Sequence, residues 1–199
     1  ELLNLLVDGL TDTHKTWWEC ETGIAYLVSG VPGWRTDRMM QIYDLSDPSE
    51  PKFIRNFGLD GQQPGATGDA PNELHGCVSV VERNRVYCGH GTAERGVLTI
   101  LDRDILINDV LVDPARPTAE ELGAPVVGQL RLPDYMGAHT ALPILDMQLE
   151  EFANDQAMDR QDFVAVVNEQ TRNECTDQAR QMMFMVEITD EAHPWPVSS

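Results

Sequence analysis

Three histidines recur along the chain at nearly constant intervals and could together bind a metal. They are His14, His75 and His139, and each opens a segment with the apolar and β-branched residues that are typical of a strand. A neutral imidazole is the commonest metal ligand among the side chains. If the three segments are equivalent units arranged around an axis, their first residues face the same central space. The spacing therefore indicates a candidate transition-metal site.

A fourth histidine, His90, is a weaker candidate for the same site. It follows Cys88 by two residues and ends a strand of the middle unit, where the other units have Ser29 or Gly30 and Asn168. His90 thus breaks the repeat, and it either adds a ligand or caps a loop. For any single histidine the alternative is a structural role as a hydrogen-bonding group. Recurrence at one position of the repeat favours the metal site for the other three.

The elements that would position these histidines form a repeat of roughly 60 residues. Its clearest part is an apolar run that closes on a carboxylate, with a further Asp two or three residues later. Each unit is predicted to contain a histidine-led strand, a second short strand, the carboxylate run and an outer strand, in that order. In the first unit these are 14–21, 24–29, 39–44 and 51–57, and in the second they are 75–82, 85–90, 97–102 and 125–132. In the third unit they are 139–145, 163–168, 182–187 and 194–199.

Four short antiparallel strands in each repeat are the pattern of a propeller blade. The sequence therefore predicts an all-β chain, a single partial β-propeller over 1–199 with three four-stranded antiparallel blades at about 14–57, 75–132 and 139–199. Closed propellers have about four to eight blades. We therefore interpret the chain as a segment of a larger propeller, whose remaining blades belong to the parent chain or to other fragments. The alternative is a small assembly that closes by oligomerisation.

Three insertions make the repeat longer than a usual blade. The segment 58–72 is rich in Gly, Pro, Gln and Asp, which predicts a long surface connection. The segments 104–123 and 146–162 are acidic, and residues 149–154 could form a short helix.

Two of the carboxylate runs resemble the signature of a known family. Leu-Thr-Ile-Leu-Asp at 98–102 and Gln-Ile-Tyr-Asp-Leu-Ser-Asp-Pro at 41–48 are similar to the motif of LVIVD-repeat β-propeller proteins. Asn-Arg-Val-Tyr at 84–87, followed by Gly-Val-Leu at 96–98, fits the same pattern. The resemblance covers most of the chain and implies the propeller fold. Much of that family has no assigned biochemical role.

The histidine arrangement is similar, more distantly, to other propellers. Selenium-binding protein/methanethiol oxidase and nitrous oxide reductase propellers hold copper with channel-facing histidines. This similarity implies copper as the metal at His14, His75 and His139, with His90 as a further ligand, and a copper-dependent oxidoreductase activity.

The charge of the chain excludes some partners. Against 33 acidic residues there are only 14 Lys and Arg, and the net charge is −19. Binding to nucleic acid or to an anionic membrane surface needs clustered cations, so neither is expected. No stretch approaches the roughly 20 apolar residues of a transmembrane helix. The acidic residues form either a solvated surface or a rim that attracts cations such as Ca²⁺.

The four cysteines do not have the spacing of a zinc ribbon. A tight hairpin at 83–84 would make Cys77 and Cys88 diagonal neighbours at about 7–8 Å, where a disulfide is strained. A bridge between Cys20 and Cys175 and a set of free buried thiols are the alternatives. Oxidised cysteines would indicate a periplasmic or secreted protein.

Two functions of different class follow. In the first, the protein is an extracytoplasmic propeller with a metal-binding histidine ring, a copper-dependent oxidoreductase acting on an unknown small molecule. In the second, it is a non-enzymatic LVIVD-type propeller that acts as a protein or ligand interaction module. No Ser-His-Asp order and no paired carboxylates stand out, so hydrolysis has no candidate catalytic residues.

Overall fold

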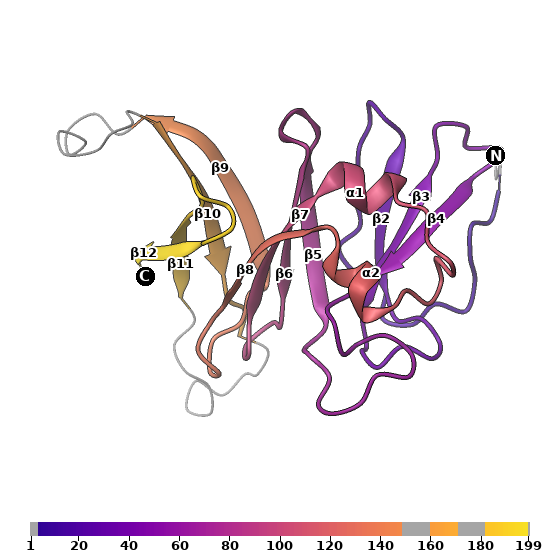
Figure 1. Ribbon diagram of the computed structural model, residues 1–199, viewed down its shortest axis with the longest axis horizontal. Coiled ribbons are helices and arrows are strands. Elements are labelled where there is room, and N and C mark those ends of the chain that lie inside the picture. The colour runs from indigo at the N-terminus through magenta and orange to yellow at the C-terminus, as the bar shows by residue number, and fades with distance from the viewer. Residues whose placement is uncertain (1–3, 149–159, 171–181, 199) are drawn as a thin grey trace.

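The chain folds into three antiparallel sheets. The computed structural model describes residues 4–148, 160–170 and 182–198. Within these residues each sheet has four strands, and strands that follow one another in sequence are neighbours in the sheet. Figure 1 shows the three sheets standing side by side in chain order. The predicted all-β class and the three four-stranded antiparallel units are therefore confirmed.

The strand bounds follow the predicted repeat closely. The first sheet contains β1 (Trp17–Trp18), β2 (Ile24–Ser29), β3 (Met39–Asp44) and β4 (Lys52–Phe57). The second contains β5 (Leu74–Val80), β6 (Arg85–His90), β7 (Val97–Asp102) and β8 (Val126–Arg131). The third contains β9 (Thr140–Gln148), β10 (Arg160–Val167), β11 (Met183–Glu187) and β12 (Trp195–Ser198). Only β1 is much shorter than predicted, so His14 precedes its strand.

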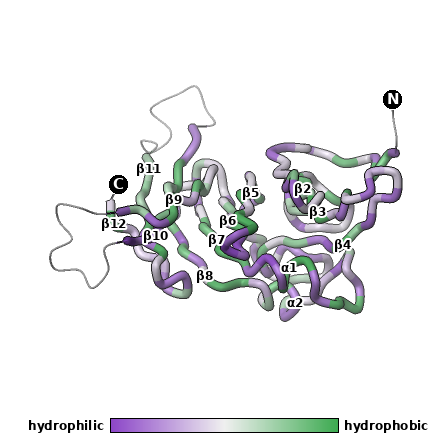
Figure 2. The backbone as a smooth tube through the Cα atoms, turned by 90° about the horizontal axis from the view of Figure 1, so that it is seen from above, coloured by the Kyte–Doolittle hydropathy of each residue, from purple (hydrophilic) through white to green (hydrophobic). Residues whose placement is uncertain are grey.

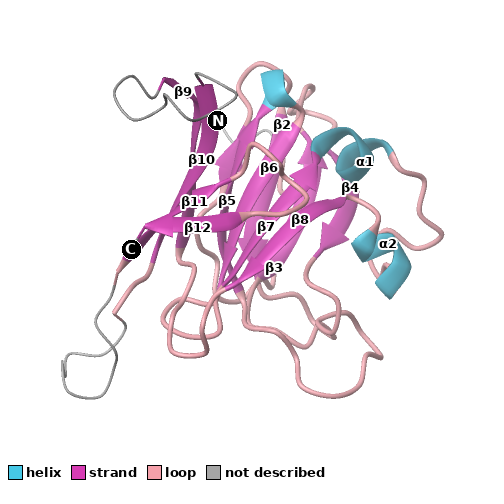
Figure 3. Cartoon of the chain, turned by 60° about the vertical axis from the view of Figure 1, so that its left-hand side comes forward, coloured by secondary structure: helices cyan, strands magenta, loops and turns pink. Residues whose placement is uncertain are grey.

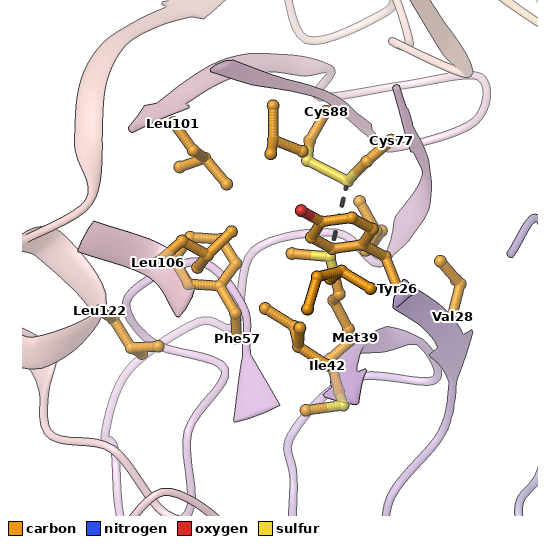
Figure 4. Packing of buried hydrophobic residues seen from close by; sticks show 14 of the residues in the cluster. Tyr26, Val28, Met39, Ile42, Phe57, Cys77, Cys88, Leu101, Leu106 and Leu122 are labelled. Atoms are coloured by element: carbon orange, nitrogen blue, oxygen red, sulfur yellow. Dashed lines mark hydrogen bonds between the residues drawn. A yellow bond between two sulfur atoms is a disulfide. The ribbon is translucent and has the colours of Figure 1, made fainter. Parts of the chain in front are cut away.

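The middle sheet is buried on both faces. Successive residues of a strand point to opposite sides, so β6 sends Val86 and Cys88 toward the first sheet and Tyr87 toward the third. Figure 4 shows the first of these two clusters, where Tyr26 packs near the two cysteines and Phe57 lies beside Leu106. In Figure 2 long hydrophobic stretches follow β6, β9 and β11. Burial between sheets explains the continuous apolar runs in the sequence.

The hairpin between β5 and β6 differs from its prediction. Its turn takes four residues, 81–84, because Asn84 adopts a left-handed conformation at φ 54° that asparagine tolerates well. Cys77 therefore lies directly opposite Cys88 and forms a disulfide with it, at a Cα separation of 4.1 Å. The prediction that the two cysteines are diagonal neighbours was therefore wrong, because the pairing register of β5 with β6 differs from the expected one by two residues. Cys20 is a free exposed thiol. Its partner in the alternative bridge, Cys175, lies outside the described residues.

The insertions are more ordered than expected. The predicted surface loop 58–72 buries its first half, since the Gln62 amide accepts from the Leu59 N–H and donates to the carbonyl oxygens of Pro71 and Asn72. A side-chain amide thus satisfies backbone groups that would otherwise need water. The segment after β7 forms two short helices, α1 (Arg103–Asn108) and α2 (Ala119–Gly123), which lie together beside the sheets in Figure 3. The helix expected at 149–154 lies outside the described residues.

Candidate metal centre

The structure brings together the three histidines that begin the repeat units. The Nε2 atoms of His14 and His75 are 2.7 Å apart. The rings of His75 and His139 lie with their centroids 3.6 Å apart and their planes tilted by 39°. Residues from three different sheets therefore share one small central space.

Two of the histidines occupy equivalent positions in their sheets. The backbone N–H of His14 donates to the carbonyl oxygen of Val28 at 2.9 Å, and that of His139 donates to Val167 at 2.8 Å. Both acceptors lie near the end of the second strand of the same sheet. The repeated backbone contact fixes each imidazole at the beginning of its unit, which is why the spacing in the sequence revealed them.

His75 is placed by a different device. Leu74 pairs with His90 and Gly76 pairs with Gly89, so His75 is the additional residue of a β-bulge. A bulge interrupts the alternation of side chains and re-aims the extra residue. Here it turns a buried side chain, 2% exposed, toward the other two histidines.

A carboxylate that was absent from the predicted ligand set completes the group. The Oε2 atom of Glu169 is 3.4 Å from Nε2 of His139 and 3.9 Å from Nε2 of His75. The ligand atoms of these three residues all lie within 4.8 Å of one another, so the three could hold a metal ion. Glu169 follows β10, and its backbone N–H donates to the carbonyl oxygen of Thr92 at 3.1 Å. The only signal in the sequence is that Glu169 comes directly after the end of a repeat strand.

His90 lies apart from this group. Within the described residues it makes no ring contact or hydrogen bond with the other histidines, and both of its ring nitrogens are buried without a partner. Alternation along β6 explains its place, because His90 is on the same face as Cys88 and points toward the apolar space between the first two sheets. Burial lowers its pKa to about 3.

The surroundings keep the imidazoles of His75 and His139 neutral. Burial, together with the neighbouring His139 and His14, lowers the pKa of His75 to about 3. Burial also lowers the pKa of His139, an effect that nearby Lys15 reinforces and Glu169 opposes. A neutral imidazole carries the unprotonated nitrogen that a metal needs.

Hydrogen bonds on the far side of His139 orient its ring. The Thr140 hydroxyl is 2.7 Å from Nδ1 of His139, and Nζ of Lys15 donates to the same hydroxyl oxygen at 2.8 Å. An ammonium only donates, and a hydroxyl oxygen can accept twice, so Thr140 can also accept the Nδ1–H of His139. In that tautomer Nε2 is unprotonated, on the side where Glu169 lies. Such support behind a ligating histidine is usual in metal sites.

The separations between the candidate ligand atoms match more than one coordination geometry. Two ligand atoms bound at about 2.0–2.1 Å lie about 2.9 Å apart at right angles and about 3.4 Å apart in a tetrahedron. The hydrogen-bonded Nε2 atoms of His14 and His75, 2.7 Å apart, are closer to the first value, and the 3.4 Å between Nε2 of His139 and Oε2 of Glu169 equals the second.

Comparison with known proteins adds no assignment. No protein-family model matches the chain, and no curated protein matches it. None of the helices in the described ranges combines the length and apolarity that crossing a bilayer requires. The function is therefore argued from the site alone.

Proposed function

We propose that the protein belongs to a β-propeller and binds a transition metal at His75, His139 and Glu169, with His14 as an additional ligand. The observation that carries this proposal is the mutual proximity of the three ligand atoms beside a third imidazole. In this proposal the protein is a metal-dependent oxidoreductase, and the central metal is redox-active.

Copper is the metal that we propose first. A set of imidazole nitrogens and one carboxylate oxygen is suited to Cu(II), which accepts N and O ligands. The second candidate is Fe(II), because two histidines and one carboxylate are the ligands of many non-haem iron oxygenases. The position of Glu169 near both His75 and His139 favours this alternative.

The propeller itself is supported by how the sheets stack. The register puts Leu142, Met183 and Trp195 on the face of the third sheet that is turned away from the second sheet. These side chains are 53%, 52% and 66% exposed. The equivalent faces between the sheets of this chain are buried, so we propose that further blades pack against this one.

An extracytoplasmic location is part of the proposal. The disulfide between Cys77 and Cys88 supports it, since structural disulfides persist in oxidising compartments and are rare in the cytosol.

Metal analysis of the native protein tests the proposal. We expect about one copper or iron ion per chain after native purification, and its loss in His75→Ala and Glu169→Gln. His193→Ala is the matched control, because His193 is exposed and pairs with Asp190 in a surface turn. Electron paramagnetic resonance distinguishes Cu(II) with nitrogen ligands from adsorbed copper. Equal metal content in wild type and His75→Ala contradicts the proposed centre.

The second function is a non-enzymatic interaction module. The net charge of −19 favours this alternative, because an acidic surface attracts Ca²⁺ or a basic partner. It predicts less than about a fifth of a transition-metal ion per chain, together with Ca²⁺ binding that is insensitive to His75→Ala.

A further inference from the structure

A cleft lies beside the candidate metal centre. Its volume is about 310 Å³, and residues 15–17, 76–78 and 139–142 line it. The first strands of all three sheets contribute to its walls. His139 belongs both to the cleft and to the metal-binding group, so a molecule in the cleft lies next to the centre.

Lys15 crosses this cleft from the first sheet to the third. Its backbone forms a bridge with Gly76 of β5, and its ammonium donates to the hydroxyl oxygen of Thr140 at 2.8 Å. A Cβ on Gly76 would lie only 2.9 Å from the Cβ of Lys15 and 3.2 Å from its Cδ. The glycine therefore makes the room that the lysine side chain needs, and the ammonium is held at a defined place.

The cleft combines this one cation with apolar walls. Trp17, Val78 and Leu142 line it, and Lys15 is one of only two lysines in the chain. The hydrogen bond to Thr140 uses one of the three ammonium donors, so the remaining donors are available to a ligand. Burial lowers the pKa of Lys15, which nearby Glu169 opposes.

We propose that the cleft binds a small organic carboxylate, with Lys15 holding the carboxylate group and the apolar walls holding the hydrocarbon part. The proposal names the substrate class of the proposed function and rests on it for the catalytic role of the site. A single ammonium matches a single carboxylate, whereas phosphate sites commonly add Arg or several backbone N–H groups. The volume is at the lower end of the range of about 300–1,000 Å³ for ligand sites, which selects small molecules.

The geometry also relates the ligand to the metal. Thr140 and Lys15 lie on the Nδ1 side of His139, and Glu169 lies on its Nε2 side. A carboxylate bound at Lys15 is thus separated from the metal-binding nitrogen by one imidazole ring.

Binding of benzoate to the full chain tests the proposal. Calorimetry is done on the chelator-treated protein and on the metal-loaded protein, with metal content measured in each sample. We expect Lys15→Met to weaken benzoate binding at least about tenfold in both forms, and Lys15→Arg to retain most of it. Lys52→Met, which removes the other lysine from an exposed position, is the matched control and leaves binding unchanged. Benzamide, which has the same shape without the charge, binds at least about tenfold more weakly.

A second measurement guards against misfolding of the lysine variants. An unchanged urea midpoint shows that Lys15→Met is folded. Benzoate binding that is equal in wild type and folded Lys15→Met overturns the proposal, and so does the absence of binding to the wild type. If Lys15→Met does not fold, equal binding of benzoate and benzamide by the wild type overturns it. If the chain takes up no metal but binds benzoate through Lys15, the cleft is supported and the metal function fails.

Discussion

Replacing Glu19 by glutamine tests how the first two sheets are held together. The Glu19 carboxylate is only 2% exposed and accepts hydrogen bonds from Nε of Arg103 at 2.8 Å and Nη2 of Arg103 at 2.6 Å. It also accepts from the hydroxyls of Tyr26 in β2, of Thr22 in the turn before β2 and of Ser79 in β5. One carboxylate therefore connects β2, β5 and the beginning of α1.

The expected loss of stability follows from burial and charge. Removing one partner of a buried ion pair costs about 3–5 kcal/mol, because the other charge is left uncompensated. Arg103 is 12% exposed, so it cannot recover full hydration in the variant. Burial by itself raises the pKa of Glu19, but the hydrogen bonds from Arg103, Ser79, Thr22 and Tyr26 outweigh it and lower the pKa from 4.5 to about 2. A shift of that size corresponds to about 3 kcal/mol at neutral pH.

Urea unfolding at two pH values measures this contribution. With a slope of about 2 kcal/mol per molar urea, Glu19→Gln lowers the midpoint by about 1.5 M at pH 7. The folded pKa lies below the unfolded one, so the stabilisation is present above pH 4.5 and is lost as the pH falls toward 2. The difference between wild type and Glu19→Gln therefore shrinks on acidification. Glu21→Gln, at an exposed position in the same turn, is the control and leaves the midpoint unchanged.

The reasoning is refuted if Glu19→Gln and Glu21→Gln unfold at the same urea concentration at pH 7. It is also refuted if the difference between wild type and Glu19→Gln does not change between pH 7 and pH 3. Arg103→Met completes a double-mutant cycle, and its coupling to Glu19→Gln should be about 2 kcal/mol or more for residues that share a buried pair.

Two further predictions concern the disulfide and the metal centre. Replacing Cys77 and Cys88 together by serine should lower the free energy of unfolding by about 2–3 kcal/mol, because the disulfide closes a short loop in the unfolded chain. A wild-type melting temperature that does not change on addition of reductant contradicts this prediction. Thr140→Val should weaken metal binding about 10–100-fold, because it removes the hydrogen bond to Nδ1 of His139, and Thr140→Ser should retain the wild-type affinity. Competition with a chromophoric chelator measures the metal affinity of each variant. Equal affinities in the wild type, Thr140→Val and Thr140→Ser contradict the orienting role of Thr140.

The strand layout was readable from the sequence because the strands have local signals. The segments 24–29 and 85–90 were predicted with the bounds that β2 and β6 have. The first is a nearly continuous apolar run and the second contains the apolar residues 86–88, which burial between stacked sheets favours. The equivalence of His14 and His139 was also predictable, because both begin a unit and their backbones make the same contact.

The details that shape the site depend on contacts between sheets. The four-residue turn before β6 shifted the pairing by two residues, and only the native register places Cys77 opposite Cys88. The bulge at His75 leaves no pattern in the residue types, since it depends on how β5 pairs with β6. The burial of Gln62 likewise depends on loop contacts distant in sequence.

Glu169 shows why a repeat can reveal some candidate ligands and conceal others. The histidines recur because each begins a repeat unit, even though a bulge places His75. Glu169, in contrast, follows the second strand of the third unit alone. No residue at the equivalent positions could reveal it, and its approach to His139 is visible only in three dimensions. A negatively charged carboxylate attracts a divalent ion more strongly than a monovalent one. Glu169→Gln should therefore reduce the affinity for Cu(II) more than the affinity for Cu(I). Separate titrations with the two oxidation states measure the two affinities. An equal loss of affinity for both ions contradicts the role assigned to the charge of Glu169.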